Sequence, residues 1–199
     1  FASLESATAD LCNPMSRNRC GINIGEAAVL FLLRRAPAEV ALLGAGASSD
    51  AHHISSPEPS GRGAEAAMRA ALAEASLAPG DIGYLSLHAT ATPKNDEMES
   101  LATARVFPEG VACSGTKPLT GHTLGASAAT ELAFCWLALH PHWNPGRQLP
   151  PHRWDGEADP ALPALRLADE ASRLEGRHCM SNAFAFGGNN LSLILGATP

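Results

Sequence analysis

The sequence predicts an α/β protein built from layers of strands and helices. Short apolar runs that suit buried strands occur at residues 82–87 and 111–114. Segments with apolar side chains at helical spacing alternate with them, at residues 64–75 and 93–106. Because strands that alternate with helices pack as sheets covered by helices, this order favours the α/β class.

Two strands are expected before the first helix. Residues 27–33, A-A-V-L-F-L-L, form a continuous apolar run closed by two arginines and Pro37, which is typical of a strand buried on both faces. A second strand begins at residues 40–43 and ends in the glycine-rich stretch G-A-G-A-S-S-D. Residues 55–63 are dense in Pro, Ser and Gly, so they are expected to form a loop.

The middle of the chain alternates helices with strands. Apolar side chains at 64–75 form one face of a helix that a Pro-Gly pair ends. Residues 82–87 and 111–114 are strand candidates. Between them, Pro93 suits the first turn of a second helix, with Thr92 as its cap.

The last part of the chain adds one helix and two strands. The helix at residues 124–139 carries a single charge, Glu131, so we expect it to be buried nearly all round. Residues 178–182 and 191–195 are expected to be strands on either side of the loop A-F-A-F-G-G-N-N. The intervening segment 141–163 contains Pro and Trp but no distinctive motif.

Composition and charge exclude several classes of protein. Hydrophobic residues make up 45% of the chain, charged residues 17%, and the formal net charge is −6, which argues against a disordered chain and a nucleic-acid binder. We find no apolar stretch of membrane-spanning length and no signal peptide. Five cysteines without metal-site spacing favour a reducing cytoplasm and no metal. Because the first residue is Phe1, we interpret the chain as a fragment.

Three clusters of residues could carry chemistry. The first, H-A-T-A-T-P, begins at His88, includes Thr90 and Thr92, and is followed by Glu99. It comes at the carboxyl end of a predicted strand, where reactive groups of α/β folds lie. By itself the pattern is more typical of a satisfied surface turn.

The second cluster is G-T-K-P-L-T-G-H, which contains Lys117 and His122. It leads into the helix at 124–139, so His122 is expected near a helix amino terminus. The partial positive charge there disfavours imidazolium, and a neutral imidazole can donate a hydrogen bond to a carbonyl oxygen. The alternative is a helix-capping histidine with a solvated lysine nearby.

The third cluster is S-N-A-F-A-F-G-G-N-N, whose Phe184 and Phe186 would by themselves indicate core packing. In this order and at these separations, the three clusters resemble the β-ketoacyl-acyl-carrier-protein synthases of the thiolase-like superfamily. The carboxyl-terminal half of that family carries H-G-T-G-T-P-x-N-D, then K-x-x-x-G-H-x-x-G-A, then S-N-S-F-G-F-G-G-T-N. Weaker likenesses at N-R-C-G-I-N-I-G-E-A-A and S-S-D-A-H-H-I-S-S-P extend the match across most of the chain.

The resemblance implies a thiolase-like layered fold, in which two similar halves form a five-layer αβαβα architecture. Residues 1–36 would end the N-terminal half, and residues 37–199 would form the C-terminal domain with its α/β/α layers. Such enzymes condense malonyl carrier protein with an acyl thioester, with loss of CO₂, in fatty-acid or polyketide and polyene synthesis. Their nucleophilic cysteine lies in the first half, so the fragment alone is expected to be inactive.

The resemblance also implies partners. An acyl carrier protein delivers the substrate on a phosphopantetheine arm, so no separate cofactor is expected. The full-length protein is expected to form a homodimer or a ketosynthase heterodimer, with no nucleic-acid or membrane partner.

Roles for individual residues follow from the match of motifs. His88 and His122 correspond to the histidines that donate hydrogen bonds to the malonyl thioester carbonyl. Lys117 corresponds to the lysine near them, and Glu99 to the acid that pairs with that lysine. Thr90 and Thr92 correspond to the threonines that contact the phosphopantetheine arm. Phe186 corresponds to the residue that supplies an oxyanion-hole N–H, and together with Phe184 it corresponds to the pocket gate. Glu131 corresponds to a structural acid.

Some positions depart from the family pattern. Ala89 and Ala91 replace glycines of the first motif, and Ala183 and Asn189 replace Ser and Thr of the third. Ala185 replaces the glycine between the two phenylalanines, which would stiffen a loop that the family uses as a gate. These changes suggest a divergent relative from a polyketide or polyene pathway.

The motifs argue against two alternatives and leave a third open. A thiolase is disfavoured because Cys179 does not stand in a C-x-G motif. Cys113 lies in A-C-S, which looks like a nucleophile motif, but it immediately precedes the lysine segment. A non-catalytic partner resembling a chain-length factor stays open, because the residue at the nucleophile position lies outside this sequence.

Overall fold

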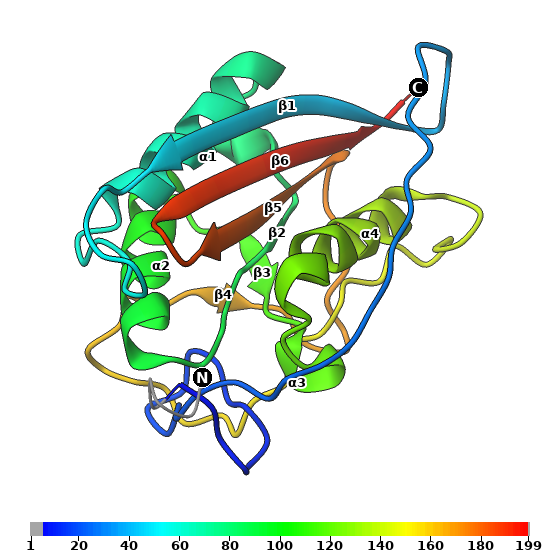
Figure 1. The fold of residues 1–199 in the computed structure, drawn as a ribbon. Helices are drawn as coiled ribbons and strands as arrows, with labels where there is room; N and C mark the ends of the chain where they lie inside the picture. The colour runs from blue at the N-terminus through cyan, green and yellow to red at the C-terminus, as the bar shows by residue number, and fades with distance from the viewer. Residues whose placement is uncertain (1–5, 199) are drawn as a thin grey trace.

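The computed structural model describes residues 6–198, which form one mixed sheet with helices on both faces (Figure 1). The described strands are β1 (Val40–Ser49), β2 (Tyr84–Ser86), β3 (Ala112–Ser114), β4 (Arg166–Leu167), β5 (His178–Ala185) and β6 (Asn189–Ala197). The helices are α1 (Arg62–Ala75), α2 (Pro93–Val106), α3 (Lys117–Thr120) and α4 (Ser127–Leu139), with 3₁₀ turns η2 (Pro79–Asp81) and η3 (Leu124–Ala126). The predicted α/β class is confirmed.

The sheet has the strand order β1-β6-β5-β2-β3-β4. Strands β5, β2, β3 and β4 run parallel to one another, whereas β6 is antiparallel to both β1 and β5. The carboxyl ends of β2, β3 and β5 therefore meet at the same edge of the sheet. Since the three sequence clusters follow these three strands or end them, the topology brings all three clusters together.

Helices α1 and α2 pack on one face of the sheet and α4 on the other, as Figure 1 shows. Strand β1 continues through the glycine-rich stretch to Ser49, instead of ending there as the sequence suggested. The reason is the close approach of α1. A Cβ at Gly44 or Gly46 would overlap the backbone of Ala71 or Ala67, so only glycine lets the helix lie directly on this strand.

The strand predicted at residues 27–33 is absent from the structure. These residues have no sheet partner among the described residues, and Leu30 and Leu32 are 98% and 89% exposed. A strand forms only when neighbouring backbone satisfies its hydrogen bonds, and an apolar run alone does not supply that neighbour.

The helix expected at 124–139 begins with one 3₁₀ turn and becomes α-helical only at Ser127. Its burial is also less complete than expected. Cys135 and Leu139 are buried against the sheet, but Leu137 is 41% exposed, and Trp136, which packs against the same core, is only half-buried.

The segment without a motif packs against the beginning of the described chain. Arg17 pairs with Glu157 and Arg19 with Asp159, and the hydroxyl of Ser16 donates to Asp155 at 2.9 Å. The 153–159 region thus fixes residues that lie some 140 positions earlier in the sequence.

We expect the 199-residue chain, expressed alone, to self-associate at tens of micromolar. Leu30 and Leu32 expose nearly all of their apolar surface, and contiguous apolar surface of this kind drives association. Sedimentation velocity and binding of a hydrophobic dye measure the effect. Replacing Leu30 and Leu32 by Ser should reduce both signals, with Leu11→Ser, at another exposed leucine, as the matched control. A monomer that binds no dye would contradict the expectation.

Candidate active site

The loop after β2 carries His88, and a buried carboxylate holds its backbone. The two carboxylate oxygens of Glu99 on α2 accept hydrogen bonds from the backbone N–H of His88 at 2.6 Å and of Ala89 at 2.7 Å. Glu99 is fully buried, and burial raises its pKa to about 7, against the lowering effect of these amides. Two charge-assisted bonds to one carboxylate fix the direction in which the chain leaves the strand.

This loop adopts a backbone conformation that favours glycine. Ala89 and Ala91 have φ angles of 41° and 61°, in the left-handed region, which costs roughly 1 kcal/mol for each alanine. The glycines of the family motif stand at these two positions, so the replacements keep the conformation and add strain. Thr90 stands between these two alanines and Thr92 follows them, and the hydroxyl oxygens of the two threonines lie 2.8 Å apart.

His88 and His122 meet edge to face at the carboxyl edge of the sheet. Their ring centroids lie 5.4 Å apart at an interplanar angle of 83°, and the ring of Phe184 lies 6.0 Å from that of His88. His88 is buried, and within residues 6–198 its Nδ1 has no hydrogen-bond partner. Since buried polar atoms in proteins almost always have a partner, this nitrogen is poised for a group that the described residues do not supply.

Both imidazoles are held in the neutral form. Burial, the Lys117 ammonium and His122 lower the pKa of His88 well below its usual value. Burial and Lys117 lower the pKa of His122 to about 4. A neutral His122 was expected, but the expected cause was wrong. His122 lies five residues before α4 begins at Ser127, so burial and a nearby cation, not the helix terminus, exclude the proton.

Lys117 opens the short helix α3 and is 1% exposed. Its ammonium donates to the carboxylate of Glu131 on α4 and to the carbonyl oxygen of His88. The expected pairing of Lys117 with Glu99 is therefore wrong. The oxygens of Glu99 are already occupied by the amides of the His88 loop, so Glu131 provides the partner instead.

The third cluster forms a hairpin. Ala185 still pairs with Asn189 in the β5–β6 ladder, so the predicted loop shortens to residues 186–188. Phe184 is buried beside His88, whereas Phe186 in the turn is half exposed. The assignments of these two residues to a pocket gate, and of Phe186 to an oxyanion hole, stay predictions.

The turn at residues 186–188 is held by hydrogen bonds from residues for which the sequence predicted no individual role. The carboxylate of Asp50 accepts a hydrogen bond from the Asn190 side chain at 2.7 Å, and the Asp50 N–H donates to Gly188 O at 2.8 Å. Gly187 N–H donates to Ile54 O at 2.7 Å. Two sequence signals could have identified Asp50: its position at the end of the glycine-rich run and its place in S-S-D-A-H-H, the stretch that resembles a family loop.

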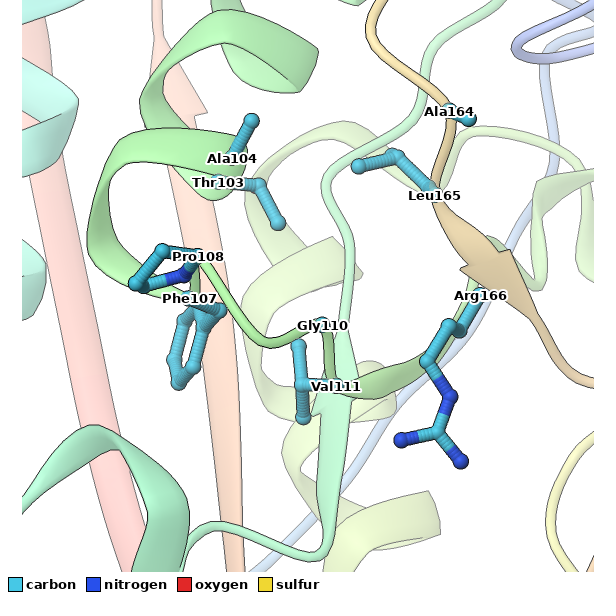
Figure 2. Close-up of a pocket in the computed structure, with 9 residues that line it drawn as sticks. All are labelled: Thr103, Ala104, Phe107, Pro108, Gly110, Val111, Ala164, Leu165 and Arg166. Atoms are coloured by element: carbon cyan, nitrogen blue, oxygen red, sulfur yellow. The ribbon is translucent and has the colours of Figure 1, made fainter.

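The cavity in Figure 2, of about 90 Å³, lies elsewhere. The end of α2 and the beginnings of β3 and β4 line it, with Phe107, Val111 and Leu165 among the lining residues. It therefore occupies the amino-terminal edge of the parallel strands, opposite the histidines. Among residues 6–198 no group of three His, Cys, Asp or Glu side chains is arranged to hold a metal ion. No described helix is long and apolar enough to cross a membrane.

Replacing Glu131 by Gln should lower the free energy of unfolding by about 3–5 kcal/mol, because it leaves the Lys117 ammonium buried without its counter-charge. Urea or thermal unfolding of the protein measures the change. The control is Glu157→Gln, which removes the exposed pair with Arg17 and should cost less than about 1 kcal/mol. Equal losses of stability from the two substitutions would contradict the expectation that the buried pair matters more than the exposed one.

Comparison with known proteins agrees with this geometry. Residues 40–148, more than half of the chain, match the family model described as beta-ketoacyl synthase, C-terminal domain. The chain is 37% identical to nodulation protein E of Rhizobium leguminosarum bv. trifolii, over 97% of this chain and 49% of the relative. It is also 37% identical to the mitochondrial 3-oxoacyl-[acyl-carrier-protein] synthase of Arabidopsis thaliana, over 95% of this chain and 43% of the relative.

A solved ketosynthase in complex with its chain length factor, from Xenorhabdus doucetiae, superimposes with a TM-score of 0.94 at 50% identity, covering all of this chain and 49% of that one. The ishigamide ketosynthase/chain length factor superimposes with a TM-score of 0.86 at 32% identity, covering all of this chain and 50% of that one. The chain thus spans about half the length of the relatives it matches. It belongs to the β-ketoacyl synthase family, with a thiolase-like fold, and corresponds to the family's carboxyl-terminal half.

Proposed function

We propose that the full-length protein is a 3-oxoacyl-[acyl-carrier-protein] synthase that condenses malonyl carrier protein with an acyl thioester in fatty-acid or polyketide synthesis. The observation that carries the proposal is the pair of neutral imidazoles, His88 and His122, with ring centroids 5.4 Å apart at the carboxyl edge of the sheet. Neutral N–H donors held in fixed positions suit an oxygen that becomes negative during a reaction.

The proposed reaction begins with loss of CO₂ from the malonyl group. The bond between the α-carbon and the carboxylate breaks, and its electron pair moves into the thioester as an enolate. N–H donors from His88 and His122 stabilise the thioester oxygen, which is more negative in the transition state than in the substrate. The α-carbon then attacks the acyl thioester carbonyl, a carbon–carbon bond forms, and the thiolate of a cysteine in the N-terminal half leaves.

Cys113 does not suit the nucleophile's role. It is fully buried in β3, and burial raises the pKa of its thiol far above the usual value, so a thiolate is strongly disfavoured there. This supports the proposal that the acyl-accepting cysteine belongs to the other half and that the 199-residue chain is inactive alone.

The other residues around the histidines are proposed to support the same step. Burial and the Lys117 charge together keep both imidazoles neutral, and Glu131 compensates that charge. Thr90 and Thr92 would contact the phosphopantetheine arm, which brings the substrate, so no separate cofactor is required. Phe186 would supply an oxyanion-hole N–H and, with Phe184, a gate.

The proposed partners are an acyl carrier protein and a second synthase-like chain, in the cytoplasm. Both solved relatives named above are ketosynthases with chain length factors, which supports a heterodimer over a homodimer. The same relatives keep the alternative function, a chain-length-factor-like subunit, in view. His88, His122 and Lys117 favour the synthase, and a cysteine at the nucleophile position of the N-terminal half would decide the matter.

In the full-length protein, His88→Ala and His122→Ala should each lower CO₂ release from malonyl carrier protein about a hundredfold, because one donor to a developing oxyanion is lost. The double variant should lose less than the product of the two, since both act on one oxygen. Acyl labelling of the cysteine should persist, because acyl transfer occurs before negative charge develops on the malonyl thioester oxygen. Radiolabel transfer and CO₂ release are measured separately, and loss of labelling with retained CO₂ release would contradict the assigned roles.

CO₂ release should fall as the pH drops through about 7, where Glu99 gains a proton. The raised pKa means that the carboxylate, the better acceptor for the His88 and Ala89 amides, exists fully only above this pH. Glu99→Gln mimics the protonated acid, so its rate should stay at the low plateau from pH 8 to pH 5. His122, with a pKa of about 4, adds no step in this range. A pH step near 7 that survives in Glu99→Gln would rule out this origin.

A further inference from the structure

His152 lies in the segment without a motif, yet both of its ring nitrogens are bonded. The backbone N–H of Gly115 donates to Nδ1 at 3.0 Å, and Nε2 lies 3.0 Å from the carbonyl oxygen of Pro14. Because Nδ1 accepts, the proton sits on Nε2 and is donated to Pro14 O, so one neutral tautomer satisfies both contacts. His152 is 6% exposed.

The contact at Gly115 falls where the two histidine loops touch. Gly115 stands between β3 and α3, two residues before Lys117 and seven before His122. A Cβ built on Gly115 would overlap the Cβ of Ala89, next to His88, whereas its other neighbours lie at 3.7 Å. The methyl group of Ala89 thus packs against the Cα of Gly115, and this contact sets the spacing of the two histidine loops.

The other ring hydrogen bond of His152 goes to Pro14, in a segment that is itself held in place. Pro14 precedes Met15, whose N–H donates to the buried carboxylate of Asp96 on α2 at 2.8 Å. The backbone N–H of His152 donates to Ala168 O at 2.7 Å, which ties the imidazole to the chain just beyond β4. The ring therefore bridges two supports and presents Nδ1 to Gly115.

We propose that His152 is a positioning residue for the condensation site, which holds Gly115 against Ala89 and thereby sets the separation of His88 and His122. The proposal rests on the proposed function for its kinetic consequence, but not for its structural one. The hydrogen bond to Gly115 carries the effect, and the bond to Pro14 serves to orient the ring.

Two conservative substitutions separate the two bonds. Asn at position 152 places its amide oxygen near the position of Nδ1 and keeps the acceptor for Gly115, whereas Gln places its amide nitrogen near Nε2 and keeps the donor to Pro14. The full-length protein is compared as wild type, His152→Asn, His152→Gln and His152→Ala. His142→Asn, at an exposed histidine of the same segment, is the matched control.

We expect His152→Asn to keep CO₂ release within about threefold of wild type. His152→Gln and His152→Ala should lose on the order of tenfold to a hundredfold in kcat, with KM for malonyl carrier protein nearly unchanged, since the donors are misplaced while the substrate arm still binds. Amide hydrogen exchange at Gly115 should accelerate in the Gln and Ala variants only. A loss in KM alone, or an Asn variant as impaired as the Ala variant, would overturn the proposal.

The packing contact is tested independently. Gly115→Ala should lower both thermal stability and CO₂ release, and the double variant Ala89→Gly with Gly115→Ala should recover them, because it removes one of the two overlapping methyl groups. Additive losses would overturn the role of this contact. If the wild type itself releases no CO₂, the proposed function fails, whereas Gly115 exchange and the stability cycle still support or refute the positioning by His152.

Discussion

The buried ammonium of Lys117 is the constraint on which the site depends. A charge that is 1% exposed must be compensated where it lies, and two groups from different elements do so: the Glu131 carboxylate on α4 and the His88 carbonyl after β2. The helix on one face of the sheet is thereby tied to the loop at its edge. Burial is the main cause that lowers the pKa of both histidines, and the same Lys117 charge lowers it further, so this lysine contributes to both their position and their protonation.

Motif order predicted the site well because topology follows from element order. Once residues 82–87 and 111–114 are parallel neighbours, the residues that follow them must share an edge of the sheet. The choice between Glu99 and Glu131 as the partner of Lys117 could not be made this way. Both are buried helix carboxylates, and only the three-dimensional packing shows that one is already saturated by backbone amides.

Residues 27–33 and His152 show two further limits of the sequence. An apolar run predicts burial without naming the surface that buries it, and within residues 6–198 that surface is absent. His152 contacts positions 37 and 138 residues away, both through backbone atoms, so no residue type at either position signals the contact. Long-range contacts to backbone leave no pattern in a single sequence.

The departures from the family motifs are absorbed by local geometry. Ala89 fits because position 115 has no side chain, and the hydrogen bond from its N–H to Glu99 holds its strained backbone. Ala185 fits because it lies in the strand ladder, where the backbone needs no positive φ. In the turn between β5 and β6 the positive φ angles fall on Gly187 and Gly188, where glycine adopts them without cost.

Strand β6 is the last described strand in sequence, yet it lies between β1 and β5 in the sheet. During synthesis on the ribosome, β1 therefore emerges more than a hundred residues before β6, its hydrogen-bonding neighbour, exists. Until then no strand joins β1 to β5, and the edges of both strands that will pair with β6 border an open seam. The nascent protein must keep this seam from pairing with other chains, and its folding rate is bound to the slow closure of long-range contacts.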